Sequence, residues 1–163
     1  VSAVEGQHRT TEPQVRQGVA PVWGVGADLR WRLTPCVGIA GEFYTGQGLG
    51  TYNGAILQNI NLDGATPANS TLDSIRSTGG WLETFSYWTS RLHSHVGYGI
   101  DDVRDQDVSA TQRTENSTLF ANCLWDVNQT FRIGLEYTYR RTKYRSFPDN
   151  GGSALHTQFQ WAF

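Results

Sequence analysis

The sequence predicts an all-β protein, an antiparallel up-and-down transmembrane β-barrel with about seven or eight strands. Apolar and polar residues alternate over most of the chain. Short turns alternate strictly with longer polar stretches, and aromatic residues gather near the strand ends. We expect residues 1–17 to be a loop or irregular segment and residues 18–163 to form the barrel.

The composition is compatible with such a barrel. The chain has 163 residues, enough for one domain, and is 38% hydrophobic. A barrel strand is apolar on one face only, so low mean hydropathy does not argue against a membrane barrel. The net charge of −2 argues against binding to nucleic acid. We expect Cys36 and Cys123 to be small apolar residues and not a disulfide, because they fall on strands or turns that are not neighbours.

The first strands show the clearest alternation. Odd positions from Trp23 to Leu33 are apolar, while the even positions between them are glycine or charged. Residues 34–36 read as a short turn, followed by a strand over residues 37–45. Residues 46–78 are rich in Gly, Asn, Thr and Ser and predict one large loop, which would form a constriction if it folds inward.

Five further strands are expected over residues 79–87, 91–100, 119–126, 131–140 and 155–163. Residues 88–90 and 127–130 are short turns, and residues 101–115 and 144–152 are longer loops. Pairing across residues 88–90 is expected to put Trp81, Phe85 and Tyr87 on the same face as Leu92. It also puts Glu83 there, which is unfavourable for a lipid-facing surface.

The loop rhythm predicts the direction of the chain, because outer-membrane barrels have short periplasmic turns and long extracellular loops. The last strand would then run toward the periplasm. The aromatic residues at the two strand ends would form two girdles at the membrane interfaces, made of Trp31, Trp81, Tyr98, Trp125, Phe131, Tyr139, Trp161 and Phe163.

The strand count raises a question about closure. Seven strands are visible, whereas single-chain bacterial barrels usually have an even number. Either residues 1–17 hide an eighth strand, or the chain is the C-terminal part of a larger barrel. We expect the latter, because the polar N-terminal segment is typical of the end of an extracellular loop.

Several segments resemble a family of bacterial outer-membrane porins. They are residues 79–81, 96–102, 116–122, 125–127 and 132–139, together with the terminal Phe163. The likeness covers about Val22 to the end of the chain. It implies a channel for passive diffusion in the bacterial outer membrane, and a C-terminal strand read by the barrel assembly machinery. Porins of this family are much longer than this chain.

Charged residues on the polar faces of the strands are the main candidate functional residues. They could line a pore and select solutes by charge, or they could form ion pairs that hold a narrow lumen shut. We expect the pore lining. The candidates are Asp28, Arg30, Arg32, Glu42, Arg132, Glu136 and Arg140.

Metal and catalytic signals are weak. His93 and His95 share one strand face, but no third ligand accompanies them. Asp101 and Asp102 begin an acidic loop with Asp105 and Asp107, whose spacing does not match a calcium loop. No catalytic triad or dyad is visible, so we expect no metal, no cofactor and no enzyme activity.

The leading hypothesis is therefore an outer-membrane, porin-like channel for small hydrophilic solutes. Its expected partners are the lipid bilayer and the barrel assembly machinery, with a homo-oligomer as a further option and no nucleic acid. One alternative is a small outer-membrane barrel that serves as an anchor or adhesion module through its loops. Another is a soluble β-barrel that binds a small apolar ligand, in which the apolar strand faces would point inward.

Overall fold

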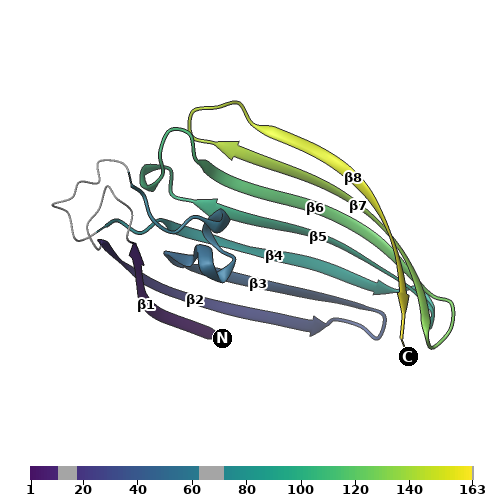
Figure 1. Cartoon of the computed structure of the whole chain (residues 1–163). Coiled ribbons are helices and arrows are strands. Elements are labelled where there is room, and N and C mark those ends of the chain that lie inside the picture. Colours follow the sequence, from purple (N-terminus) through teal and green to yellow (C-terminus); the bar gives the residue numbers. More distant parts are fainter. Residues whose placement is uncertain (11–17, 63–71, 163) are drawn as a thin grey trace.

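The structure, a computed structural model, describes residues 1–10, 18–62 and 72–162. Eight strands form one antiparallel sheet in chain order, with each strand beside the next (Figure 1). The strands are β1 (Ser2–Thr10), β2 (Gly18–Arg32), β3 (Val37–Gln47), β4 (Arg76–Tyr87), β5 (Leu92–Val103), β6 (Arg113–Asp126), β7 (Phe131–Tyr144) and β8 (Asn150–Trp161). Short 3₁₀ turns are η1 (Leu49–Tyr52), η2 (Ala55–Leu57) and η3 (Asp105–Asp107).

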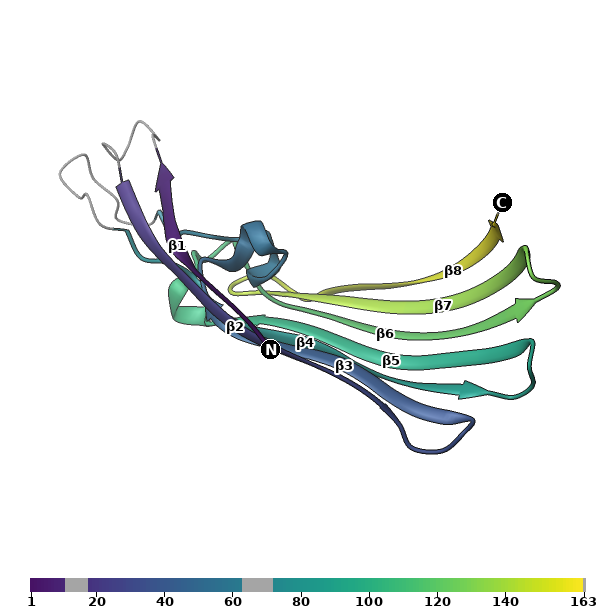
Figure 2. The ribbon, with the colours of Figure 1, turned by 90° about the horizontal axis from the view of Figure 1, so that it is seen from below.

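The sheet is curved and open. Within the described ranges β1 pairs with β2 and β8 pairs with β7, while β1 and β8 do not meet. The sheet has a concave side, and η1 and η2 lie on it (Figure 2). The predicted all-β, up-and-down antiparallel fold is confirmed.

In the described ranges, no helix has the length and apolar character needed to cross a membrane.

The prediction of a loop over residues 1–17 is wrong for β1. Ser2–Thr10 pairs along its whole length with residues 18–26 of β2. Its sequence lacks an apolar face, since Glu5 and Gln7 occupy the positions that carry apolar side chains in β2. Backbone pairing with β2 forms this strand, although its sequence lacks the apolar–polar alternation that predicts a strand. Residues 11–17 of the same prediction lie outside the described residues.

The three short turns lie where the sequence predicts them, at residues 33–36, 88–91 and 127–130. The second residue of each turn accepts hydrogen bonds from the backbone that follows. Thr34 Oγ1 accepts from Val37 N at 2.9 Å, Thr89 Oγ1 from Leu92 N at 2.9 Å, and Asn128 Oδ1 from Phe131 N at 2.9 Å. Such local acceptors are the reason Thr and Asn favour turns.

The longer connections lie together at the other end of the sheet (Figure 1). They are shorter than predicted, because β4 already begins at Arg76, β5 continues to Val103, and β8 begins at Asn150. The alternation of short turns with longer loops is retained. The sheet therefore has a short-turn end and a loop end.

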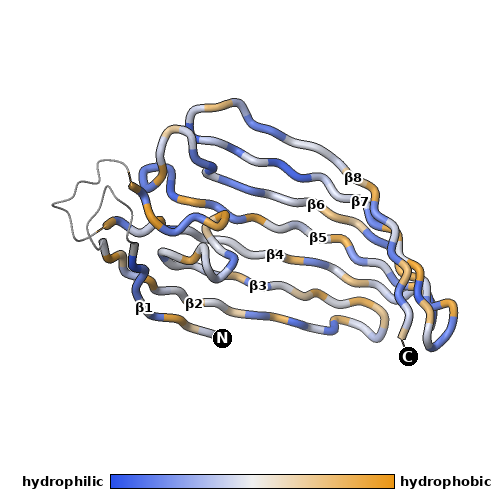
Figure 3. The backbone as a smooth tube through the Cα atoms, viewed as in Figure 1, coloured by the Kyte–Doolittle hydropathy of each residue, from blue (hydrophilic) through white to orange (hydrophobic). Residues whose placement is uncertain are grey.

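The two faces of the sheet differ in chemistry, as alternation predicts. Paired residues share a face, so the register assigns every position. Leu49 of η1 packs over Gly24 and Gly46, which places the even residues of β2 and β3 on the concave face. Figure 3 shows hydrophobic and hydrophilic residues interspersed along the strands. The convex face carries large exposed apolar side chains, including Val25, Leu29, Phe43, Leu82, Val96, Leu119, Leu135, Leu155 and Phe159.

The predicted face of β4 is wrong. Tyr87 pairs with His93 and Phe85 with His95, so the odd residues of β4 share the face of the histidines and not that of Leu92. A shift of one residue across a turn moves every side chain to the opposite face, and the sequence did not define this turn closely enough. The correction places Glu83 on the polar concave face.

Aromatic rings on the concave face pack over glycines of the neighbouring strand. A Cβ atom on Gly38 would lie 2.2 Å from the ring of Phe85, and one on Gly97 would lie 2.4 Å from the ring of Phe120. The missing side chains let both rings lie close against the sheet. This packing covers glycine backbone that would otherwise be exposed.

The buried core lies at the loop end, between η2 and the sheet. Ala55 and Ile56 of η2 pack with three apolar residues of the strands and loops around them. These are Ile75, Val103 and Val108. The core therefore fixes the long β3–β4 connection on the concave side.

Candidate functional site: the concave face and its inward segment

The structure places all seven predicted charged residues on the concave face. Asp28 lies directly opposite Glu42, and Arg132 lies between Asp126 and Gln160. Glu136 lies between Asn122 and His156. Arg30, Arg32 and Arg140 occupy even positions of β2 and β7 and so share this face.

Ion pairing on this face is sparse. Of the seven, only Arg132 has an ion pair in the described part of the chain, from its Nε to Asp126 Oδ1 at 2.5 Å. The Arg30 guanidinium lies over the Phe85 ring at 4.8 Å, and Glu42 accepts a hydrogen bond from Trp81 at 3.4 Å. The other six charged residues therefore have no ion pair within the described ranges.

The β3–β4 connection folds onto the concave face. We call residues 48–58 the inward segment; they include η1 and η2 (Figure 2). Asp101 of β5 anchors it, because its Oδ2 accepts from Ile56 N at 2.6 Å and its Oδ1 accepts from the Tyr44 hydroxyl at 2.6 Å. Arg113 adds a second anchor, with Nη2 donating to Ile56 O at 3.0 Å and its own carbonyl accepting from Gln58 Nε2 at 2.9 Å.

The backbone of the inward segment is strained. Ala55, Ile56 and Leu57 have φ values of 51°, 51° and 61°, in the left-handed region. This region costs about 1–2 kcal/mol for each residue with a Cβ atom, and β-branched Ile56 is an especially unfavourable occupant. Such a turn persists only where its surroundings fix it. The Asp101 and Arg113 anchors and the buried Ile56 supply that constraint.

The two predicted histidines belong to a chain of ionisable groups near the short-turn end. His95 Nδ1 lies 3.1 Å from Glu83 Oε1, and the two histidine rings approach to 3.4 Å between Nδ1 of His93 and Nε2 of His95. His93 Nε2 in turn lies 3.7 Å from Asp126 Oδ2. The described residues contain no group of three or more side chains suited to a metal ion.

The predicted acidic loop is not a cluster. Asp101 points to the concave face and anchors the inward segment, whereas Asp102 pairs with Glu115 in register on the convex face. Asp107 is bound by Arg76, with Nε donating to Oδ2 at 2.6 Å. Asp101 and Asp102, which the sequence offers only as weak metal candidates, therefore lie on opposite faces of β5 and do not face a common site.

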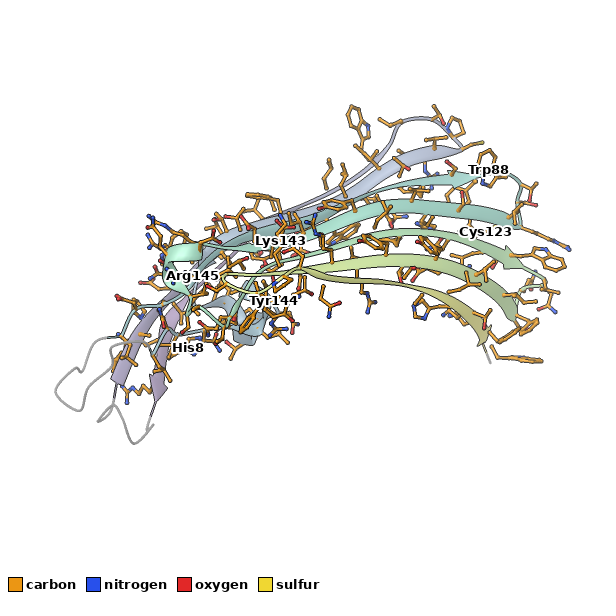
Figure 4. All side chains as sticks on the ribbon, turned by 90° about the horizontal axis from the view of Figure 1, so that it is seen from above. His8, Trp88, Cys123, Lys143, Tyr144 and Arg145 are labelled. Atoms are coloured by element: carbon orange, nitrogen blue, oxygen red, sulfur yellow. The ribbon has the colours of Figure 1, made fainter. Side chains whose placement is uncertain are left out.

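Tryptophans form a row along the convex face at the short-turn end. Each hairpin contributes one, and β8 ends with another; they are Trp31, Trp88, Trp125 and Trp161. The sequence predicts only a turn at Trp88, which is labelled in Figure 4. Its indole donates to Ser94 Oγ of the convex face at 2.8 Å. Phe131 packs against Trp161 with ring centroids 4.7 Å apart.

The loop end of the convex face carries a second aromatic row. Tyr98 and Tyr139 both pair with Leu119, so they lie level with one another. Trp81 does not belong to this row, since it pairs with Glu42 and lies on the concave face. Phe163 lies outside the described residues.

Charged residues lie beyond that aromatic row, toward the loops. Lys143, which is labelled in Figure 4, contacts Glu115 Oε2 with its Nζ at 2.6 Å. Arg141 forms an ion pair with Asp149. The order along the convex face is therefore tryptophans, aliphatic residues, tyrosines and then charges. Transmembrane barrels show this order because the aromatic residues mark the membrane interfaces.

Comparisons with known proteins identify the fold. No family model and no curated protein sequence matches the chain. A solved structure does: the outer membrane channel DcaP of Acinetobacter baumannii, with a TM-score of 0.82 and 9% sequence identity, over 99% of this chain and 45% of that one. The chain has the fold of an outer-membrane channel. The chain spans less than half of that channel's length. The predicted porin-like β-barrel fold is confirmed.

Proposed function

We propose that the chain forms part of a porin-like channel of the bacterial outer membrane, through which small hydrophilic solutes diffuse passively. The opposite chemistry of the two sheet faces supports this function most directly. The convex face carries aliphatic side chains between two aromatic rows, as a lipid-facing surface requires. The concave face carries charges of both signs, as a water-filled lumen requires.

The inward segment supplies the constriction in this proposal. It lies on the concave face and is held there by Asp101 and Arg113. Solutes that pass it would meet acidic and basic side chains on the facing strands, and the field between them would act on the solute charge. A rigid, anchored segment would keep the opening constant, as passive diffusion requires.

Closure of the pore is part of the proposal. Unpaired backbone N–H and C=O groups are not tolerated in the hydrocarbon region of a membrane. The free edges of β1 and β8 therefore need partner strands, from the same polypeptide or from another copy. The likeness to under half of a longer channel supports the former. We also propose that β8, with Phe159 and Trp161 on its convex face, is the strand that the assembly machinery recognises.

The soluble alternative is disfavoured by the direction of the apolar face. A soluble barrel would put Leu29, Leu135 and Phe159 inside, whereas their side chains are exposed on the convex side. The anchor alternative differs from the channel only in conduction. It predicts the same membrane insertion without ion flow.

Planar-bilayer recording of the purified protein tests the channel. We expect stepwise, ohmic current in potassium chloride after insertion. Insertion without conductance would contradict the channel and favour the anchor. A protein that stays monodisperse without detergent would contradict the membrane location altogether.

A further inference from the structure

A cavity lies between the inward segment and the concave face of β1 to β3. Its volume is about 400 Å³, and it is bounded by Leu49 and Tyr52 of η1 and by Val4, Glu42 and Tyr44 of the strands. Gly24 allows the approach of η1, because a Cβ atom there would lie 2.8 Å from Leu49 Cδ2. The cavity therefore lies beside the constriction, on the route proposed for solutes.

The walls of this cavity are aromatic and aliphatic. Tyr52 is 58% exposed, which leaves its ring available to a solute, and Leu49 is buried and forms part of the floor. The hydroxyl of Tyr44 is bound to Asp101, so its half-buried ring and not its polar end borders the cavity. Small-molecule sites characteristically combine such walls with a few placed polar groups.

Glu42 is the acidic residue among the described residues that line the cavity. Its carboxylate is exposed and accepts one hydrogen bond, from the Trp81 indole at 3.4 Å. Asp28 lies directly opposite Glu42 on the same face, and neither has an ion pair within the described ranges. Two like charges in a cross-strand pair are unfavourable, so a cation would stabilise them. Arg30 does not supply it, because its guanidinium lies over the ring of Phe85.

We propose that this cavity is a binding subsite for a small organic cation that carries an apolar or aromatic portion. The Glu42 carboxylate would hold the ammonium group. The rings of Tyr52 and Tyr44 would contact the cation and its apolar portion, because aromatic faces attract cations. Asp28 adds negative potential that disfavours anions. The inference deepens the proposed function, since solutes would reach the cavity through the lumen.

Isothermal titration calorimetry of the purified protein in detergent tests the subsite without requiring conduction. The probes are benzyltrimethylammonium, benzoate and benzyl alcohol, which share one ring and differ in charge. We expect binding of the ammonium and none of benzoate at the same concentrations. Tyr52→Ala should weaken the ammonium affinity by about threefold, given the usual strength of cation–π contacts. Glu42→Gln should weaken it by at least as much, because it removes the carboxylate charge that faces the ammonium group.

Two variants serve as controls. Tyr52→Phe keeps the ring and should retain the ammonium affinity, which separates ring contact from damage to the fold. Glu115→Gln removes the same charge from the convex face and should leave binding unchanged. Equal binding of benzoate, or unchanged binding in Glu42→Gln, would overturn the subsite. Absence of conductance with intact ammonium binding would contradict the channel alone.

Discussion

Asp101 is the residue on which the position of the inward segment depends most. Its carboxylate accepts two hydrogen bonds of 2.6 Å, one from the Ile56 amide and one from the Tyr44 hydroxyl. Only the bond to Ile56 joins Asp101 to the inward segment, since Tyr44 belongs to β3. A hydrogen bond to a charged group is worth about 1.5–3 kcal/mol, so Asp101→Ala weakens the hold on the segment by about 1.5–3 kcal/mol. The left-handed backbone of residues 55–57 stores about 3–6 kcal/mol at about 1–2 kcal/mol per residue. Without its anchor, the strained turn should open.

Hydrogen exchange of the Ile56 amide measures that opening directly. A loss of about 1.5–3 kcal/mol should accelerate exchange by about 10- to 100-fold, since about 1.4 kcal/mol is a factor of ten in a local opening equilibrium. Asp101→Asn keeps one acceptor and should give an intermediate acceleration. In planar bilayers we expect Asp101→Ala to increase the single-channel conductance, because the segment leaves the lumen.

Asp102→Asn is the matched control, because Asp102 follows directly on β5 but faces the convex side, opposite Glu115. It should leave both the Ile56 exchange rate and the conductance unchanged. The reasoning would be refuted if the Ile56 amide in Asp101→Ala stayed as protected as in the unaltered protein.

Two further predictions concern the faces and the loops. Leu135→Arg on the convex face should lower the free energy of unfolding from lipid by about 2–4 kcal/mol. Gln158→Arg on the concave face should change it far less. Urea titrations of liposome-inserted protein measure both losses, and equal losses would contradict the assignment of faces. The Arg76 guanidinium holds the pKa of the Asp107 carboxyl below its usual range. The Arg76–Asp107 ion pair is therefore present at neutral pH, and it is lost only as the pH falls through that lowered pKa. A spin label at Gln106 should therefore become mobile only in strong acid. In Asp107→Asn the label should be mobile at every pH. A label that is equally immobile in that variant would exclude a restraint by the Arg76–Asp107 ion pair.

Much of the fold could be predicted because alternation and turn chemistry are local properties of the sequence. The odd positions from Trp23 to Leu33 and the acceptors Thr34 and Asn128 each act on their immediate neighbours. The β1 strand escaped prediction because it has no apolar face, and its pairing with β2 is a property of the sheet. The face of β4 depended on the register across residues 88–91, because a shift of that register by one residue moves every side chain to the opposite face.

The inward segment was only partly predictable. Gly-rich composition indicated a long loop over residues 46–78, and an inward fold was one option. Its anchors are distant in sequence, since Asp101 and Arg113 reach Ile56 from β5 and β6. The left-handed turn at residues 55–57 contains no glycine, so no local signal marked it. The cavity at Glu42 likewise depends on η1 packing over Gly24.

The central claim is that the convex face contacts lipid and the concave face contacts water. Spin labels placed one at a time at residues 133–138 of β7 test it most directly, in liposomes and with Cys36 and Cys123 replaced by serine. We expect labels at odd positions to collide with oxygen in the bilayer and labels at even positions to collide with a water-soluble nickel chelate. The reverse pattern, or equal access of the chelate to every position, would contradict a lipid-facing convex surface around a water-filled lumen.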